Sequence, residues 1–416
     1  MKRPTIGEFT LVEHLGSSND GSCNVFAATR PSSSEVFAVK VLRGGNASDG
    51  WAIPRFEREA GLTCVLDHPH LCRGLESGSD ETGDCYLAMT LLRGKSLAAI
   101  LQDCGRLEWR TATQLMLHVA RAIVHLDSLG IVHRDVKPEN IMITRTSGGD
   151  AEEEGEPLVH SSCNGAAALG VTRPPKCGSD AGSHAASAAF SCDDLTAVLI
   201  DMGLARRTSE HSDEPHHGEP PPGAASGGLG GAPADAPLAP PPMRRVASPA
   251  WSAICSSGFM APEQVRDARV VQSAVDVYGL GTTWYATLTG VLPFSGSSPL
   301  KAMQQALNGE AVPATAHVPD LPPAVVALLS WLIQKEARAR PPCAASLVAE
   351  IEATLADPHD AQRVARARQA HDKRRQLQAA LTSARQIAAV SVGTLLLAWL
   401  SWETLGDASE PPTLYM

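Results

Sequence analysis

Short apolar runs separated by turn-forming residues dominate the first ninety residues and predict antiparallel β-strands. These runs lie at residues 9–12, 25–28, 36–41 and 86–92. Residues 54–66 differ, because they begin with Pro54, which favours the first turn of a helix, and contain Phe56, Ala60 and Val65 among their apolar positions. A small antiparallel sheet with one helix is therefore expected in the N-terminal part.

The chain becomes helical in character after Ser96. Between Thr111 and Leu129, apolar residues recur at spacings of three and four, as on a helix that packs one face on a core, and Gly130 follows as a typical helix end. A strand-rich part followed by a helix-rich part predicts an α+β fold of two lobes, with ligands bound between them.

Two stretches lack the apolar content of a folded core. Residues 146–194 combine an acidic run with Gly, Ala and Ser, and residues 208–247 are rich in Pro and Gly. The whole chain has 35 Gly, 30 Pro and only 4% aromatic residues. Such segments bury too little apolar surface to offset the entropy lost on ordering, so both are expected to be disordered insertions.

The charge of the chain argues against a nucleic-acid partner. Its formal net charge is −10, whereas binding to a phosphate backbone needs clustered Lys and Arg. The ten cysteines form no CxxC pair, so reduced thiols are expected rather than a zinc site or a disulfide framework.

One loop concentrates the residues that suggest chemistry. Residues 133–140 read HRDVKPEN and precede the apolar residues 141–143. This segment resembles the catalytic loop of the eukaryotic-type (Hanks-type) protein kinase family, most closely its Ser/Thr branch, which carries a Lys two residues after the Asp. The resemblance implies that Asp135 accepts the proton of the substrate hydroxyl, Lys137 steadies the γ-phosphate of ATP, and Asn140 binds Mg²⁺.

Three further positions extend the resemblance. Asp201 begins the tripeptide DMG, where the family has Asp-Phe-Gly, and is the implied second ligand of Mg²⁺. Lys40 ends the run FAVK and resembles the strand lysine that contacts the α- and β-phosphates. Glu59 matches the helix glutamate that pairs with this lysine, although Glu57 is a nearby rival.

The expected nucleotide-binding residues depart in part from the family pattern. The loop after Leu15 keeps two glycines, Gly16 and Gly21, and is longer than Gly-x-Gly-x-x-Gly. Val25 is implied to cover the adenine, Met89 to guard the back of the pocket, and Leu92 to contact adenine through its backbone.

Motifs beyond the second insertion also resemble the family. Residues 261–263 read APE, and their glutamate is implied to pair with Arg340, because a buried charge of this kind is costly when unpaired.

Arg134, beside Asp135, implies that a phosphorylated activation loop docks on it, with candidate serines at 248, 252, 256 and 257.

An uncharged segment near the C-terminus predicts a membrane anchor. Residues 387–402 would span about 24 Å as a helix, slightly less than the ~30 Å hydrocarbon core. Residues 351–386 are rich in Arg and Lys towards this segment, whereas the tail 403–416 carries carboxylates. This asymmetry predicts a single-pass helix with the preceding domain in the cytosol. An amphipathic or partner-binding helix is the alternative.

The predicted organisation is thus a bilobal kinase domain over residues 9–350, followed by a basic juxtamembrane segment and a transmembrane helix. The resemblance implies transfer of phosphate from Mg-ATP to Ser or Thr of protein substrates. It is also compatible with a dimer in which one copy phosphorylates the other. Two other hypotheses stay open. A pseudokinase would bind partners without catalysis, as the altered glycine loop suggests, and a scaffold would recruit partners through its insertions and membrane tail.

Overall fold

The computed structural model describes most of the chain outside the two predicted insertions. The described residues are 4–17, 21–43, 52–145, 194–208, 258–294, 296 and 298–406. The insertions lie outside these ranges except for their ends at Asp194 and Thr208, and so do the four candidate serines. The chain forms two units, Met1–Ala361 and Gln362–Met416.

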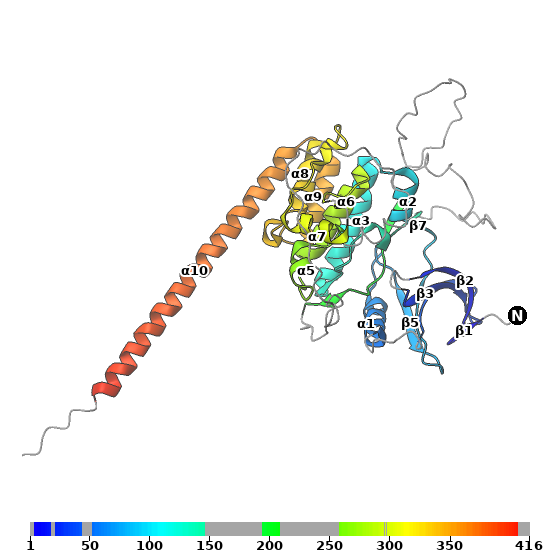
Figure 1. The fold of residues 1–416 in the computed structure, drawn as a ribbon, viewed down its shortest axis with the longest axis horizontal. Helices are drawn as coiled ribbons and strands as arrows, with labels where there is room; N and C mark the ends of the chain where they lie inside the picture. The colour runs from blue at the N-terminus through cyan, green and yellow to red at the C-terminus, as the bar shows by residue number, and fades with distance from the viewer. Residues whose placement is uncertain are drawn as a thin grey trace, which may run out of the picture. The chain divides into compact units, whose positions relative to one another are not determined.

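A curled six-stranded antiparallel sheet forms the N-terminal part of the first unit (Figure 1). Its strands, in order across the sheet, are β1 (Thr5–Ile6), β2 (Phe9–Ser17), β3 (Cys23–Thr29), β4 (Val36–Leu42), β6 (Cys85–Thr90) and β5 (Gly74–Ser79). Helix α1 (Ala52–Val65) packs against β5 and β6. This helix begins two residues before Pro54, which therefore lies in its first turn. The N–H groups of a first turn have no hydrogen-bond partner within the helix, so the N–H that proline lacks is not needed there.

The sheet buries side chains on both of its faces. On one face, the Phe9 ring meets the rings of Phe37 and Tyr86 edge to face, with centroids 5.6 and 5.8 Å apart. On the other face, Leu42 and Leu87 form a cluster with Phe56 of α1. Because side chains alternate along a strand, Lys40 of β4 lies on the same face as Leu42, the face that α1 covers.

Helices make up most of the remainder of the first unit. They are α2 (Leu97–Cys104), α3 (Trp109–Ser128), α5 (Pro262–Arg266), α6 (Ala274–Thr289), α7 (Pro299–Asn308), α8 (Pro323–Leu332) and α9 (Ala344–Ala356), with 3-10 turns η2 (Pro138–Asn140), η5 (Ala314–Ala316) and η6 (Ala337–Ala339). Helix α3 packs on α6, α9 and strand β10 (Leu195–Leu199), and Gly130 follows it with φ +66°. The predicted α+β class and its helical second part are confirmed.

Short strands hold the loops that carry the predicted chemistry. Strand β9 (Ile141–Arg145) lies between β7 (Gly94–Ser96) and β10 (Leu195–Leu199), and β8 (Ile131–Val132) pairs with β11 (Arg206–Arg207). The β9–β10 pairing is antiparallel and brings Arg145 opposite Leu195. The first insertion therefore joins two neighbouring strands, and residues 140 and 201 end up at the same end of the ladder despite their distance in the sequence.

Helix α10 (Ala361–Gly406) is the main element of the second unit. Of the helices described, it is the one long and apolar enough to cross a membrane, judged by length and composition. The predicted basic segment and the predicted transmembrane segment share this helix from Ala361 to residue 402. The predicted domain end at residue 350 falls inside α9.

Candidate active site

Asp276 of helix α6 holds the loop 133–140 by its backbone. The two Asp276 carboxylate oxygens accept hydrogen bonds from the backbone N–H of His133 at 2.8 Å and of Arg134 at 2.7 Å. Arg134 adopts φ +70°, a conformation that a non-glycine residue rarely takes without such support. Burial raises the pKa of Asp276, while His133 and the two N–H groups favour its ionised form. The buried Asp276 side chain therefore holds the start of this loop in place.

Three predicted residues of this loop contact one another. The Lys137 ammonium lies 2.7 Å from Asp135 Oδ2, and Asn140 Nδ2 donates to the same oxygen at 2.8 Å and to the Asp135 carbonyl at 2.9 Å. Lys137 and Asn140 are buried, whereas the Asp135 side chain is 18% exposed. The carboxylate is therefore oriented by two donors while part of it still faces solvent.

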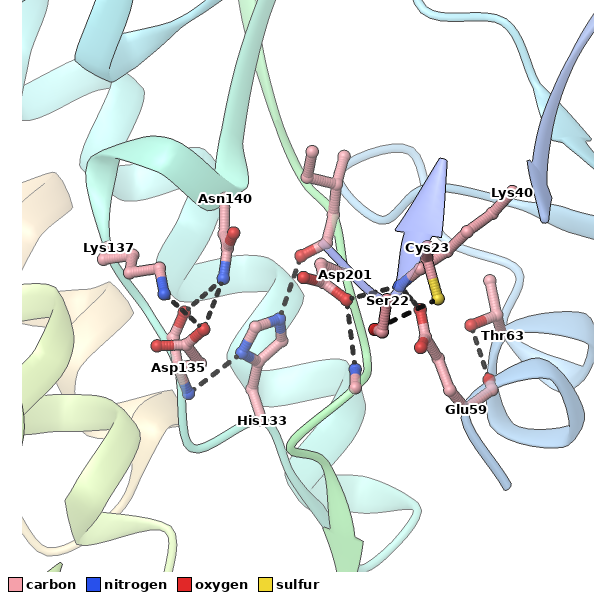
Figure 2. Close-up of polar contacts among 12 residues, drawn as sticks. Ser22, Cys23, Lys40, Glu59, Thr63, His133, Asp135, Lys137, Asn140 and Asp201 are labelled. Atoms are coloured by element: carbon pink, nitrogen blue, oxygen red, sulfur yellow. Dashed lines mark hydrogen bonds and ion pairs between the residues drawn. The ribbon is translucent and has the colours of Figure 1, made fainter. Parts of the chain in front are cut away.

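A second group joins three elements that are distant in the sequence. Lys40 Nζ donates to Glu59 Oε1 of α1 at 2.5 Å and to Asp201 Oδ1 at 3.1 Å. Figure 2 draws Asp201 between this Lys40–Glu59 pair and the Asp135 loop. Of the two candidate glutamates, it is Glu59 that the structure brings to the lysine, and Glu59 is also the one that α1 buries. The contact agrees with the predicted pairing.

Electrostatics in this group favour a protonated Lys40 and an ionised Asp201. Burial opposes the charge of Lys40, but Asp201 and Glu59 raise its pKa above that of a free lysine. Burial also opposes the ionisation of Asp201, but Lys40 lowers its pKa to about 2. Burial raises the pKa of Glu59 to about 7, against the attraction of Lys40. Asp201 keeps 42% of its side chain exposed, so this carboxylate is also accessible.

The arrangement offers oxygen ligands to a hard cation. Because the Asn140 amide nitrogen donates both of its bonds to Asp135, the amide oxygen is left as an acceptor. Asp201 adds a partly exposed carboxylate with a low pKa. Carboxylate and amide oxygens are the donors that Mg²⁺ prefers, so the residues present fit this ion. The two ammonium groups of Lys40 and Lys137 suit phosphate oxygens.

The expected nucleotide-binding residues lie in or next to strands β2, β3 and β6 of the sheet that carries Lys40. Gly16 lies in β2, and Gly21 has φ +69° just before β3. Val25 of β3 is the cross-strand partner of Lys40, and Met89 of β6 lies two residues beyond the partner of Lys40 on its other side. Leu92 follows β6 and is partly buried. Residues 18–20, the tip of the loop, lie outside the described ranges.

The predicted pairing of Glu263 with Arg340 is confirmed. Arg340 is fully buried and donates to both Glu263 oxygens, at 2.6 and 2.8 Å. Its guanidinium also lies 4.8 Å from the centre of the Tyr278 ring. Met202 is buried as a packing residue beside Asp201, as expected for the position where the family has Phe.

Several supporting contacts were not predicted from the sequence. Gln264 donates to the Arg134 carbonyl at 3.0 Å and accepts from the Ala261 N–H at 3.0 Å. His133 bonds the Ile200 carbonyl through its ring at 3.2 Å, which links the loop to the residue before Asp201. No local pattern signals these bonds. For Asp276 the sequence offers two hints: residues 276–281 resemble a buried helix of the kinase family, and a carboxylate stands at the otherwise apolar start of that helix.

Comparison with known proteins identifies the family. The model of the protein kinase domain matches residues 9–149 and 241–350, which is more than half of the chain. The chain therefore belongs to the protein kinase family, and its N-terminal sheet and helical second part correspond to the two lobes of that fold.

Bacterial serine/threonine-protein kinases are among the similar curated proteins. The chain is 26% identical to serine/threonine-protein kinase pkn3 of Myxococcus xanthus over 80% of its length and 48% of that protein. It is 24% identical to probable serine/threonine-protein kinase PknB of Bifidobacterium longum over 76% of its length and 35% of that protein. A shorter match to PknA of Mycobacterium tuberculosis is 39% identical over 113 residues. The chain thus spans less than half the length of the first two relatives.

Proposed function

We propose that the chain is an ATP-dependent serine/threonine protein kinase. The observation that carries the proposal is the junction of Lys40, Glu59 and Asp201 beside the loop that holds Asp135 and Asn140. The matching kinases, which are named as serine/threonine-specific, support the same conclusion. Lys137 two residues after Asp135 favours hydroxyl groups of Ser and Thr as acceptors.

Each residue has a role that its environment supports. Asp135, oriented by Lys137 and Asn140, accepts the proton of the substrate hydroxyl. Lys137 neutralises charge on the transferred phosphoryl group. Lys40, held by Glu59, binds the α- and β-phosphates of ATP.

Mg²⁺ would be held by Asn140 and Asp201. When bound there, the ion would neutralise phosphate charge that otherwise repels the attacking hydroxyl. We further propose that Gly16, Gly21 and Val25 cover the nucleotide, and that Met89 and Leu92 line the adenine site.

A pseudokinase is the second candidate, because the glycine loop departs from the family pattern. Such a protein would keep its fold and bind partners without transferring phosphate. The ion pairs of Lys40 with Glu59 and Asp201 argue against a pseudokinase. Charges that are buried or partly buried cost free energy, and such costly groups are concentrated at functional sites.

Phosphate transfer by the full-length protein in detergent separates these two functions. The protein is incubated with radiolabelled ATP, Mg²⁺ and myelin basic protein, and the labelled amino acids are identified after acid hydrolysis. We expect label on Ser or Thr and its loss when EDTA removes Mg²⁺. Autophosphorylation whose rate rises with protein concentration would indicate transfer between two copies. ATP binding by calorimetry without any label would favour the pseudokinase.

We propose in addition that α10 anchors the chain in a membrane, with the kinase domain in the cytosol. The apolar side chains of Leu395, Leu396 and Leu397 are all more than half exposed, which is unfavourable in water. The basic residues that precede them would face anionic lipid head groups on the cytosolic side.

The anchor is tested by extracting membranes with sodium carbonate. The wild-type chain should stay with the membrane pellet. Leu395→Arg places a charge near the centre of the span, at a cost of about 2.5–3.5 kcal/mol, and should move a large share of the protein to the supernatant. Leu377→Arg is the matched control, because the same change lies in the basic part of the same helix. Release of the wild type by carbonate would instead favour the amphipathic helix.

A further inference from the structure

Strand β10, which leads to Asp201, lies at the edge of its sheet, and the backbone groups on its outer side find hydrogen-bond partners of two different kinds. Near its end, Leu199 bonds through its backbone to the loop after α1: its N–H donates to His70 O at 2.9 Å, and its carbonyl accepts from Cys72 N–H at 2.9 Å. Ala197 lies two residues earlier, so its N–H and carbonyl point to the same edge. It is fully buried, and its polar groups therefore need partners.

Two histidine side chains provide those partners. The Ala197 N–H donates to His118 Nδ1 at 3.3 Å, and His70 Nδ1 bonds the Ala197 carbonyl at 3.1 Å. The two rings stack, with centroids 4.3 Å apart and planes within 9°. The pair of imidazoles thus takes the place of a neighbouring strand where the backbone of the loop no longer reaches.

The chemistry of the contact defines the state of each ring. A carbonyl needs a donor, so Nδ1 of His70 carries a proton, whereas an N–H needs an acceptor, so Nδ1 of His118 is bare. Burial lowers the pKa of both histidines to about 4, which keeps both rings neutral at neutral pH. His118 of α3 and His70 of the loop after α1 therefore hold the two sides of one peptide residue, and we call this arrangement the histidine clamp.

The histidine clamp links the elements that carry the two carboxylate partners of Lys40. Glu59 lies in α1, and His70 lies in the loop that leaves this helix. Asp201 follows β10, four residues after Ala197. The distance between Glu59 and Asp201 thus depends on how the loop after α1 is joined to β10. Helix α3 contacts both of them through His118, which stacks on His70 and bonds Ala197.

We propose that His70 and His118 are positioning residues that hold Asp201 in register with Glu59 through the backbone of Ala197. The proposal rests on the proposed kinase function, because the geometry that the clamp maintains is that of the phosphate-binding and metal-binding groups. Neither histidine touches the reacting atoms, so loss of the clamp should slow the chemical step more than it weakens substrate binding.

Three substitutions on α3 test the clamp by kinetics. His118→Leu replaces the imidazole with an apolar side chain and removes the acceptor of the Ala197 N–H. The kcat toward myelin basic protein should fall on the order of tenfold, with KM for that protein within about twofold. His118→Asn offers Oδ1 at the same branch point as Nδ1 and should restore kcat to within about twofold of the wild type. His125→Leu is the matched control, because His125 stacks on His68 and has no bond to Ala197. It should leave kcat unchanged.

Hydrogen exchange of residues 195–199 supplies a readout that does not need activity. His118→Leu should speed exchange of this segment, whereas His118→Asn and His125→Leu should not. If the wild type transfers no phosphate, the kinase proposal fails, and exchange still decides whether the clamp exists. Unchanged exchange and unchanged kcat in His118→Leu, or equal effects of His125→Leu, would overturn the clamp.

Discussion

Replacing Asp201 with asparagine should lower phosphate transfer by about 10²–10³-fold, the range seen when one electrostatic contact to a transition state is lost. The Asp201 carboxylate is the partner of Lys40 at 3.1 Å and offers a charged oxygen to Mg²⁺. Asparagine keeps the size and an oxygen but removes the charge that both cations require. Initial rates of label transfer at saturating ATP and Mg²⁺ measure the effect.

Asparagine is also the substitution that disturbs the backbone least at this position. Asp201 has φ +66°, and Asn, like Asp, adopts this conformation more readily than most residues. Asp103→Asn is the control, because Asp103 is an exposed carboxylate whose partner, Lys95, lies 3.0 Å away on the surface. It should retain wild-type rates. Transfer by Asp201→Asn within tenfold of the wild type would remove Asp201 from the proposed site.

Replacing Arg340 with leucine should destabilise the first unit by about 3–5 kcal/mol, as expected when one member of a buried ion pair is removed. Arg340 is 0% exposed and bonds Glu263 twice, and it also donates to the carbonyls of Gln334, Ala274 and Lys335. All of these acceptors would lose a charged donor at once. Urea unfolding of the detergent-solubilised protein, followed by tryptophan fluorescence, measures the free energy of unfolding.

Two further variants separate the charge from the volume of Arg340. Arg269→Leu removes an exposed arginine that pairs with Asp267 within the same short segment, and should change stability by less than about 1 kcal/mol. The double variant Arg340→Leu with Glu263→Leu removes both charges and should be more stable than Arg340→Leu alone. A single variant as stable as the wild type would show that the pair is dispensable.

The sequence predicted best where local pattern and chemistry agree. Alternating apolar runs indicated the strands β2, β3, β4 and β6, and the spacing of three and four indicated α3 to within two residues of each end. The start of α1 was misplaced by two residues, because Pro54 is compatible with any position in a first helical turn. The pairing of Lys40 with Glu59 rather than Glu57 came from the resemblance. The two glutamates are two positions apart and point to different sides of α1, and the tertiary structure shows which side faces Lys40.

The sequence did not indicate the contacts that support the site from behind. His70 and His118 are 48 positions apart, and each bonds a backbone atom of a strand that follows a long insertion. Nearly every residue has the same backbone N–H and carbonyl groups, so the residue types in a single sequence do not show which backbone group a side chain will bond. The same reason hides the two bonds from Asp276 to the loop 133–140 and the bond from Gln264 to Arg134.

The order of apolar residues along this chain determined which segments become strands and helices, since that property depends on neighbours a few positions away. The short catalytic-loop motif determined the family, because its charged residues lie within eight positions of one another. Tertiary packing alone decided the edge-to-face contacts of Phe9, the contact of Lys40 with Asp201, and the histidine clamp. These features join residues distant in the sequence, and their energies arise only when burial removes water from both partners.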